Sequence, residues 1–217
     1  MPEIYGLYAA GRLSPAFSLM LQTQANIRRD IADDLHLCET VASAMFERED
    51  EELLSPNAFE KALHAIDAIE ASSKTSALAP NGKPAEEALR ELAGLPEPLR
   101  ERAQSAFEDS GWKALKKGVS RLDLSENAYV KAHLYRIEPG ASVPHHTHKG
   151  DEYSLVVQGG FTDETGSYGP GDVAHQTSSD FHMPVADDDG VCFVLAVSEG
   201  GMKFSGLLGI VQKLSGR

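Results

Sequence analysis

Apolar residues recur at helical spacing along the first 75 residues of the chain. Ser14-Pro15 is a good helix start, because a hydroxyl caps the first turn and proline fits its first position. The stripe that follows, at intervals of three, four and seven, predicts an amphipathic helix. It consists of Phe17, Met20, Leu21, Ile27, Ile31 and Leu35.

A second start signal and two shorter apolar runs complete this helical segment. Ser55-Pro56 precedes another stripe, and shorter helices are expected before Gly11 and over residues 41–46. The second stripe consists of Phe59, Leu63, Ile66 and Ile69. About four helices therefore form a small bundle over residues 1–75, and most of these apolar residues are expected in its core. A bundle this small has only a small hydrophobic core, so a partner protein can help to bury the apolar stripes.

Beyond residue 110 the helical spacing gives way to short β-like runs. They cover residues 128–137, 153–157 and 191–197. Turn signals separate them at Pro139-Gly140, Gly159-Gly160 and Gly169-Pro170-Gly171. Frequent strands with frequent turns predict an antiparallel sandwich or barrel.

The segment between the two halves begins with small and polar residues. Residues 71–83 (ASSKTSALAPNGK) are typical of a linker, and short helices are expected over 86–92 and 98–106. The predicted fold class is therefore α+β, with a helical domain over 1–75, linker and short helices over 76–110, and a β-barrel domain over 111–217.

Charge and composition narrow the function classes. The chain has 33 acidic against 20 basic residues and a formal net charge of -13, which argues against direct binding to nucleic acid. No apolar run is long enough to span a bilayer, and the N-terminus lacks the features of a signal peptide, so a cytoplasmic protein is expected. Two distant cysteines, Cys38 and Cys192, exclude a disulfide framework.

Candidate chemistry concentrates in a histidine-rich stretch. His146 and His148 lie two residues apart, so on a strand both imidazoles leave the same face. Gly150 allows a bend that returns the Glu152 carboxylate, and His182 can complete the set from a neighbouring strand. Three imidazoles and one carboxylate suit Zn, Mn, Fe, Ni or Cu.

Other histidines leave alternatives open. His175 is a possible substitute ligand, whereas His145 has the opposite strand parity from His146 and should point outward. His133 is expected to be structural. Cys192, within an apolar run, is expected to be a small buried hydrophobe.

The spacing Gly140-x5-His146-x-His148-x3-Glu152-x6-Gly159 resembles the first cupin motif at every defining position. The second motif is looser, with Gly171-Asp172 opening a strand and His182 where the last ligand is expected. The resemblance implies a cupin β-barrel in which His146, His148, Glu152 and His182 hold one divalent metal ion, with zinc favoured and Mn, Fe or Ni as alternatives.

Over nearly its whole length the chain resembles the ChrR-type anti-sigma factors, which join a helical sigma-binding domain to a C-terminal cupin. The resemblance begins with YAAGxLSxAFSL at residues 8–19 and continues in order through residues 112–119, 158–165, 171–172 and 182–186. It implies a sigma factor as the protein partner. The residues that the family resemblance points to for sigma binding are Tyr8, Leu13, Phe17, Met20 and Leu21.

The helical domain departs from the family in one respect. Relatives carry a second zinc, held in part by a His-x3-Cys-x2-Cys string on the second helix, and the matching positions here are Gln24, Arg28 and Ile31. Spacings of four and three place all three on one helical face. Ile31 has no donor atom and Arg28 repels a cation, so no zinc is expected in this domain. Packing and polar contacts should replace the ion.

Three functions are open at this point. In the first, a negative regulator of transcription sequesters an alternative (ECF-type) sigma factor, and its metal-binding cupin senses a stress signal or small molecule. In the second, a metal-dependent cupin enzyme of dioxygenase or isomerase type uses Tyr153, His175 or His133 near the metal, although none of these lies in a motif that names a reaction. A structural cupin that dimerises is a third reading.

Overall fold

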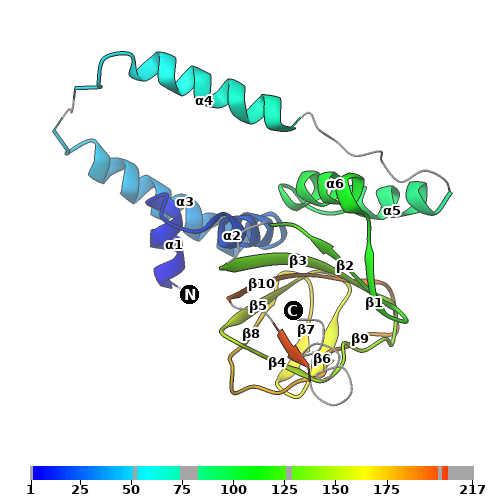
Figure 1. The fold of residues 1–217 in the computed structure, drawn as a ribbon. Helices are drawn as coiled ribbons and strands as arrows, with labels where there is room; N and C mark the ends of the chain where they lie inside the picture. The colour runs from blue at the N-terminus through cyan, green and yellow to red at the C-terminus, as the bar shows by residue number, and fades with distance from the viewer. Residues whose placement is uncertain (1, 51–52, 74–82, 126–128, 200–201, 205–217) are drawn as a thin grey trace.

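Helices occupy the first half of the described chain and strands the second (Figure 1). The computed structural model describes residues 2–50, 53–73, 83–125, 129–199 and 202–204. The helices are α1 (Pro2–Ala9), α2 (Pro15–Ile27), α3 (Arg29–Phe46), α4 (Ala58–Ser73), α5 (Lys83–Ala93) and α6 (Leu99–Ser110). Within these ranges, no helix has the length and apolar character needed to cross a membrane.

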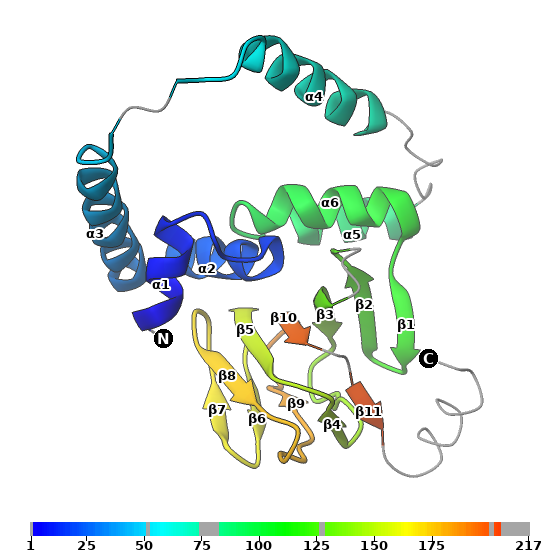
Figure 2. The ribbon, with the colours of Figure 1, turned by 60° about the vertical axis from the view of Figure 1, so that its left-hand side comes forward.

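The strands form an antiparallel barrel, which confirms the predicted α+β fold class. One sheet has the order β1-β2-β3-β10-β5-β8, and β11-β4 and β7-β6-β9 close the other side (Figures 1 and 2). The strands are β1 (Lys113–Lys116), β2 (Val119–Asp123), β3 (Val130–Ile137), β4 (His146–His148), β5 (Glu152–Gln158), β6 (Phe161–Asp163), β7 (Gly166–Tyr168), β8 (Val173–Gln176), β9 (Val185–Ala186), β10 (Cys192–Glu199) and β11 (Met202–Phe204).

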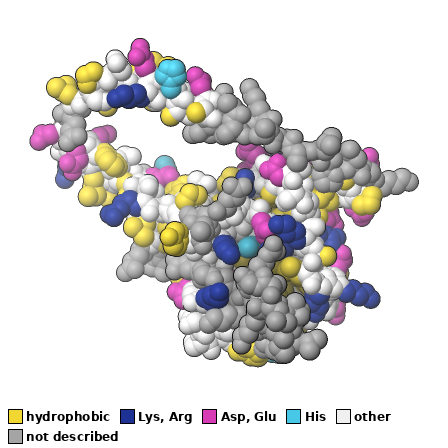
Figure 3. All heavy atoms as spheres, viewed as in Figure 1, with side chains coloured by type: hydrophobic (Ala, Val, Ile, Leu, Met, Phe, Trp, Pro, Cys, Tyr) yellow, Lys and Arg dark blue, Asp and Glu magenta, His cyan; other side chains and the backbone are white. Residues whose placement is uncertain are grey.

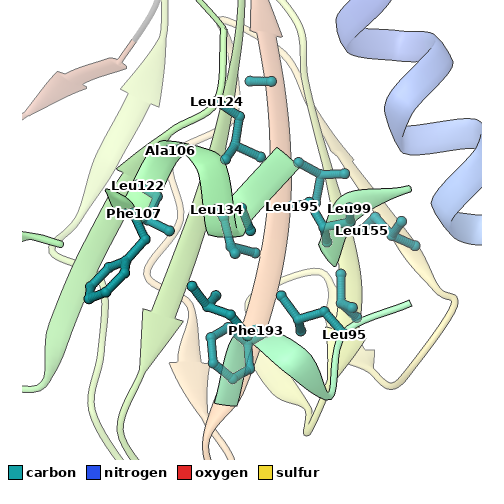
Figure 4. Close-up of a cluster of buried hydrophobic side chains, with 14 of the residues drawn as sticks. Leu95, Leu99, Ala106, Phe107, Leu122, Leu124, Leu134, Leu155, Phe193 and Leu195 are labelled. Atoms are coloured by element: carbon teal, nitrogen blue, oxygen red, sulfur yellow. The ribbon is translucent and has the colours of Figure 1, made fainter. Parts of the chain in front are cut away.

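The six-stranded sheet is apolar on both faces. Its central strands have consecutive apolar residues, and neighbouring residues of a strand point to opposite sides. Its outer face packs against α2, α5 and α6, where Leu134, Leu155 and Leu195 meet Leu99 in one core cluster (Figure 4). Its inner face forms a second cluster inside the barrel, which includes Cys192, buried as expected. The helices thus cover the outside of the barrel and leave its interior for chemistry.

The helical segment differs from the prediction at Arg28. The apolar stripe predicted one helix through Leu35, but the helix breaks at Arg28, whose backbone is extended (φ -117°, ψ 110°). Residues 41–46 then continue α3 rather than form a helix of their own. Ile31 therefore does not share a helix with Gln24, and the prediction that both lie on one helical face was wrong. The Arg28 side chain pairs with Asp30 and Asp172 at this bend, where α3 turns away from the barrel.

The linker prediction falls largely on residues 74–82, which lie outside the described residues, as does the start of the run at 128. Helix α4 lies apart from the barrel in both ribbon views (Figures 1 and 2). The short helices predicted over 86–92 and 98–106 are present as α5 and α6. The division at residues 75 and 110 stays a prediction.

Candidate metal centre

Four side chains that are far apart in sequence meet inside the barrel. Strand β4 presents His146 and His148 on one side, and Glu152 begins β5 after a bend. His182 reaches them through a short backbone bridge, in which His146 and His182 exchange both N–H···O bonds at 3.2 and 3.3 Å. All four residues are at most 4% exposed. The structure thus brings together the four residues named from the sequence.

The geometry of these side chains fits a metal ion. One ligand atom from each residue lies within 4.8 Å of the others. The Nε2 atom of His182 lies 3.1 Å from that of His146 and 3.2 Å from that of His148. A tetrahedral ion with metal–nitrogen bonds of ~2.0–2.1 Å separates its ligand atoms by about 3.3 Å. Three converging imidazole nitrogens at this spacing, with a carboxylate beside them, are suited to one divalent cation.

Two of the three imidazoles are oriented by hydrogen bonds from their other ring nitrogen. The Nδ1 atom of His146 lies 2.8 Å from the Pro144 carbonyl oxygen, and that of His182 lies 3.0 Å from Asp163 Oδ2. An N–H donated by Nδ1 to these oxygens leaves Nε2 free to bind the ion. Asp163 was not predicted as a site residue, because its role depends on a contact between side chains 19 residues apart in the chain.

Burial sets the charge of the site. It raises the pKa of Glu152 to about 8 and lowers that of His148 to about 4. For His146, burial and then the neighbouring His182 lower the pKa to about 3. Without an ion at neutral pH, both of these imidazoles are neutral and the carboxyl group is protonated. Neutral imidazoles are ready to bind a metal, whereas Glu152 must first lose its proton.

Metal affinity is therefore expected to rise with pH between 6 and 8. Below a Glu152 pKa of about 8, binding releases the carboxyl proton, so the apparent affinity increases up to about tenfold per pH unit. His146 and His148 add nothing in this window, because they are already neutral. Chelator competition at several pH values measures the slope. A Glu152→Gln variant should bind more weakly with a smaller slope, and an equal slope in both proteins would contradict this origin.

A small cavity lies beside the four side chains. Its volume is about 30 Å³, room for no more than a few water-sized molecules. His146, Glu152 and His182 line one side, and apolar side chains such as Phe161 and Val194 line much of the rest. A metal ion here could accept only a small additional ligand from this cavity.

The other histidines lie outside this group. His145 stacks on Phe181, with ring centroids 4.8 Å apart. His175, the alternative ligand, stacks on Tyr153 at 4.3 Å with a half-exposed side chain, so it does not replace His182. His133 lies 3.7 Å from Asp123 Oδ1. Among the described residues, only the predicted four form a group that could hold a metal ion.

Two of the three positions that match the zinc motif of the resembled family, Gln24 and Arg28, contact the barrel. The buried Gln24 amide donates to the Gly171 carbonyl oxygen at 2.9 Å. Arg28 pairs with Asp30 at 2.8 Å and reaches Asp172 at 3.5 Å. Its aliphatic part packs against Gly171, where an added Cβ would lie 2.4 Å from Arg28 Cγ. These side chains dock α2 on the turn before β8.

The residues that the resemblance pointed to for sigma binding differ in how deeply they are buried. Met20 and Leu21 are buried, and Phe17 packs edge-on against Tyr153 of the barrel, with centroids 5.4 Å apart. Tyr8, whose hydroxyl accepts a hydrogen bond from Gln22, and Leu13 are half-buried. A partner can reach Met20 and Leu21 only if α2 moves. Their role in binding stays a prediction.

Exposed apolar side chains form two rows elsewhere in the helical segment, one on α3 and one on α4. We call the two rows together the α3–α4 stripe; it consists of Leu37, Val41, Met45, Phe59, Leu63 and Ile66, each 45–73% exposed. The expectation that the bundle core buries Phe59, Leu63 and Ile66 was wrong, because α4 lies apart from the other helices as well as from the barrel (Figures 1 and 2). Their spacing marked an amphipathic helix but not what covers it. In Figure 3, hydrophobic side chains are visible on the surface of both helices.

Comparison with known proteins relates both halves of the chain to one protein. A family model described as ChrR cupin-like domain matches residues 100–200. The anti-sigma-E factor ChrR of Cereibacter sphaeroides is 30% identical over 201 residues, which cover 93% of this chain and 89% of that protein.

One solved structure matches along nearly the whole chain. The crystal structure of Rhodobacter sphaeroides SigE in complex with the anti-sigma ChrR matches with a TM-score of 0.67 and 28% identity, covering 92% of this chain and 97% of that one. KdgF from Halomonas sp. matches less well, with a TM-score of 0.37 and 24% identity over 42% of this chain and 86% of that one.

Proposed function

This chain belongs to the ChrR family of anti-sigma factors, and we propose that it holds an ECF-type sigma factor inactive through its helical region. The observation that carries the proposal is the match over 92% of the chain to a protein solved in complex with its sigma factor. The match includes the helices as well as the barrel, so it extends beyond the cupin fold that unrelated functions share.

The α3–α4 stripe is the surface we infer for the sigma factor. Each of the two helices exposes three large apolar side chains at helical spacing, 45–73% exposed, and clustered exposed apolar residues mark binding sites. The net charge of -13 favours approach by a basic partner surface. Tyr8, Leu13 and Phe17 can extend the contact from α1 and α2.

Co-expression with the sigma factor encoded beside its gene tests this function. A stable one-to-one complex that survives gel filtration is expected. Failure to co-purify with that sigma factor, from cells in which both proteins are folded, would overturn the proposal.

For the barrel we propose a bound zinc ion, held by His146, His148, Glu152 and His182. When bound, zinc supplies a Lewis-acidic centre that a small stress-related molecule can reach through the adjoining cavity. The four residues fix the ion, and the apolar lining keeps bulk water away. Because the chain belongs to a family of anti-sigma factors, we assign the barrel a sensory role rather than a catalytic one.

A contact route joins this site to the helices. Strand β5 carries Glu152 at the metal centre and, on its opposite face, Tyr153 against Phe17 of α2. Strand β8 pairs with β5 and follows the Gly171-Asp172 turn that holds Gln24 and Arg28. A change at the ion can therefore reach α2 through two neighbouring strands and alter the affinity for the sigma factor.

Substitution Gly171→Ala is expected to loosen α2 from the barrel. The backbone there has φ +87°, and the new Cβ would clash with Arg28. We expect stability to fall by about 1–3 kcal/mol and hydrogen exchange in α2 to accelerate more than in the barrel. Gly140→Ala is the matched control, because its φ is +66° but its Cβ would meet Asp188, away from α2. Equal effects of both variants on α2 exchange would rule out this docking role.

A further inference from the structure

The amide of Gln176 is buried in the barrel without a hydrogen-bond partner. Gln176 is 0% exposed, and neither its Nε2 nor its Oε1 atom is hydrogen-bonded in the structure. It lies two residues after Ala174, which belongs to the inner core cluster, so its side chain also points inward. An unsatisfied buried amide costs about 1–3 kcal/mol, which makes a purely space-filling glutamine an expensive choice.

Two atoms of the metal centre lack hydrogen bonds in the same way. They are His148 Nδ1 and Glu152 Oε2, both buried and 3.5 Å apart. The other two imidazoles donate from Nδ1 to Pro144 and Asp163. Of the three histidines, His148 is therefore the one whose outer nitrogen makes no hydrogen bond; Glu152 Oε2, at 3.5 Å, is close to it but not bonded.

Gln176 lies beside Glu152 in the sheet. It pairs in register with Glu152 across β5 and β8, so the two side chains leave neighbouring positions on the same inner face. The functional groups are complementary, because Nδ1–H of His148 needs an acceptor, and a Glu152 oxygen that binds the ion can still accept a hydrogen bond. A carboxamide supplies both an acceptor and a donor.

We propose that Gln176 is a positioning residue of the metal centre, which accepts a hydrogen bond from His148 Nδ1 and donates one to Glu152 Oε2, directly or across one water molecule. Through these bonds it fixes the ring tautomer of His148 and the orientation of the carboxylate. This inference rests on the proposed metal site and adds an outer residue to it, as such partners commonly tune affinity.

The experiment compares Gln176→Met, which keeps the volume but removes both hydrogen-bonding groups, with Gln158→Met at an exposed position at the end of β5. Zinc affinity is measured by chelator competition, and thermal unfolding is followed with and without zinc. In Gln176→Met we expect zinc affinity to fall about 10–100-fold, whereas the metal-free protein is as stable as the wild type or more stable. Gln158→Met should change neither.

A spectroscopic measurement separates positioning from stability. With Co²⁺ in place of zinc, the visible absorption bands report the ligand geometry, and Gln176→Met should shift them at saturating metal. If Gln176→Met binds zinc as tightly as the wild type and leaves the Co²⁺ spectrum unchanged, the inference is wrong. If wild-type protein binds neither ion, the proposed metal site itself fails, which is a different result.

Discussion

Replacement of His148 by alanine is expected to abolish tight metal binding. His148 is fully buried and supplies one of three converging imidazoles. The Nε2 atom of His182 lies 3.2 Å from that of His148 and 3.1 Å from that of His146. If a four-ligand zinc site is worth about 10–16 kcal/mol, each ligand contributes roughly 3 kcal/mol, or a factor on the order of 10²–10³ in affinity. Elemental analysis of purified protein should fall from one zinc ion per chain to almost none. Stabilisation by added zinc should disappear with it.

His145→Ala is the matched control for this variant. His145 lies three residues earlier and stacks on Phe181 rather than facing the other ligands. It should retain one ion per chain. Thermal unfolding without metal shows whether His148→Ala still folds. A wild-type protein with two tightly held ions would contradict the prediction that the helical domain has lost its zinc, and a His148→Ala protein with one would contradict the ligand assignment.

Introducing a charge into the α3–α4 stripe is expected to break the complex with the sigma factor. Val41→Asp and Leu63→Asp each place a carboxylate where an apolar contact is proposed, at sites 53% and 45% exposed. Burying an unpaired charge at an interface costs at least about 2 kcal/mol, so affinity should fall by a factor of ~30 or more for each variant. The dissociation constant of the purified complex measures the loss.

Controls for these variants lie on the same helices. Ser43→Asp and Ala65→Asp add the same charge on the opposite faces of α3 and α4, at exposed positions. They should bind within a few-fold of the wild type. Since all four sites are exposed, unfolding free energies should stay within about 0.5 kcal/mol. If the stripe variants bind as well as these controls, the sigma factor uses another surface, and Tyr8, Leu13 and Phe17 become the next residues to test.

Local sequence patterns were sufficient for the barrel and for three of the four residues of its candidate metal centre. Alternating strands and glycine turns predicted the antiparallel fold, since strand periodicity and turn chemistry are short-range properties. His146, His148 and Glu152 lie within seven residues, so strand parity and one bend bring them together. His182 could be added because a metal centre in this motif needs a fourth ligand at a known place in the chain.

Tertiary contacts decided the rest. Gln24 docks on Gly171, and Arg28, at the helix break, pairs with Asp172. The partners are about 145 positions apart in the chain, and no local pattern encodes such a pair. The same holds for Asp163 behind His182 and for Gln176 opposite Glu152. The sequence by itself determined the periodicity of each element and the chemistry of the ligands. Which apolar faces are covered and which polar groups meet was decided only by packing, because burial depends on neighbours that the chain brings together after it folds.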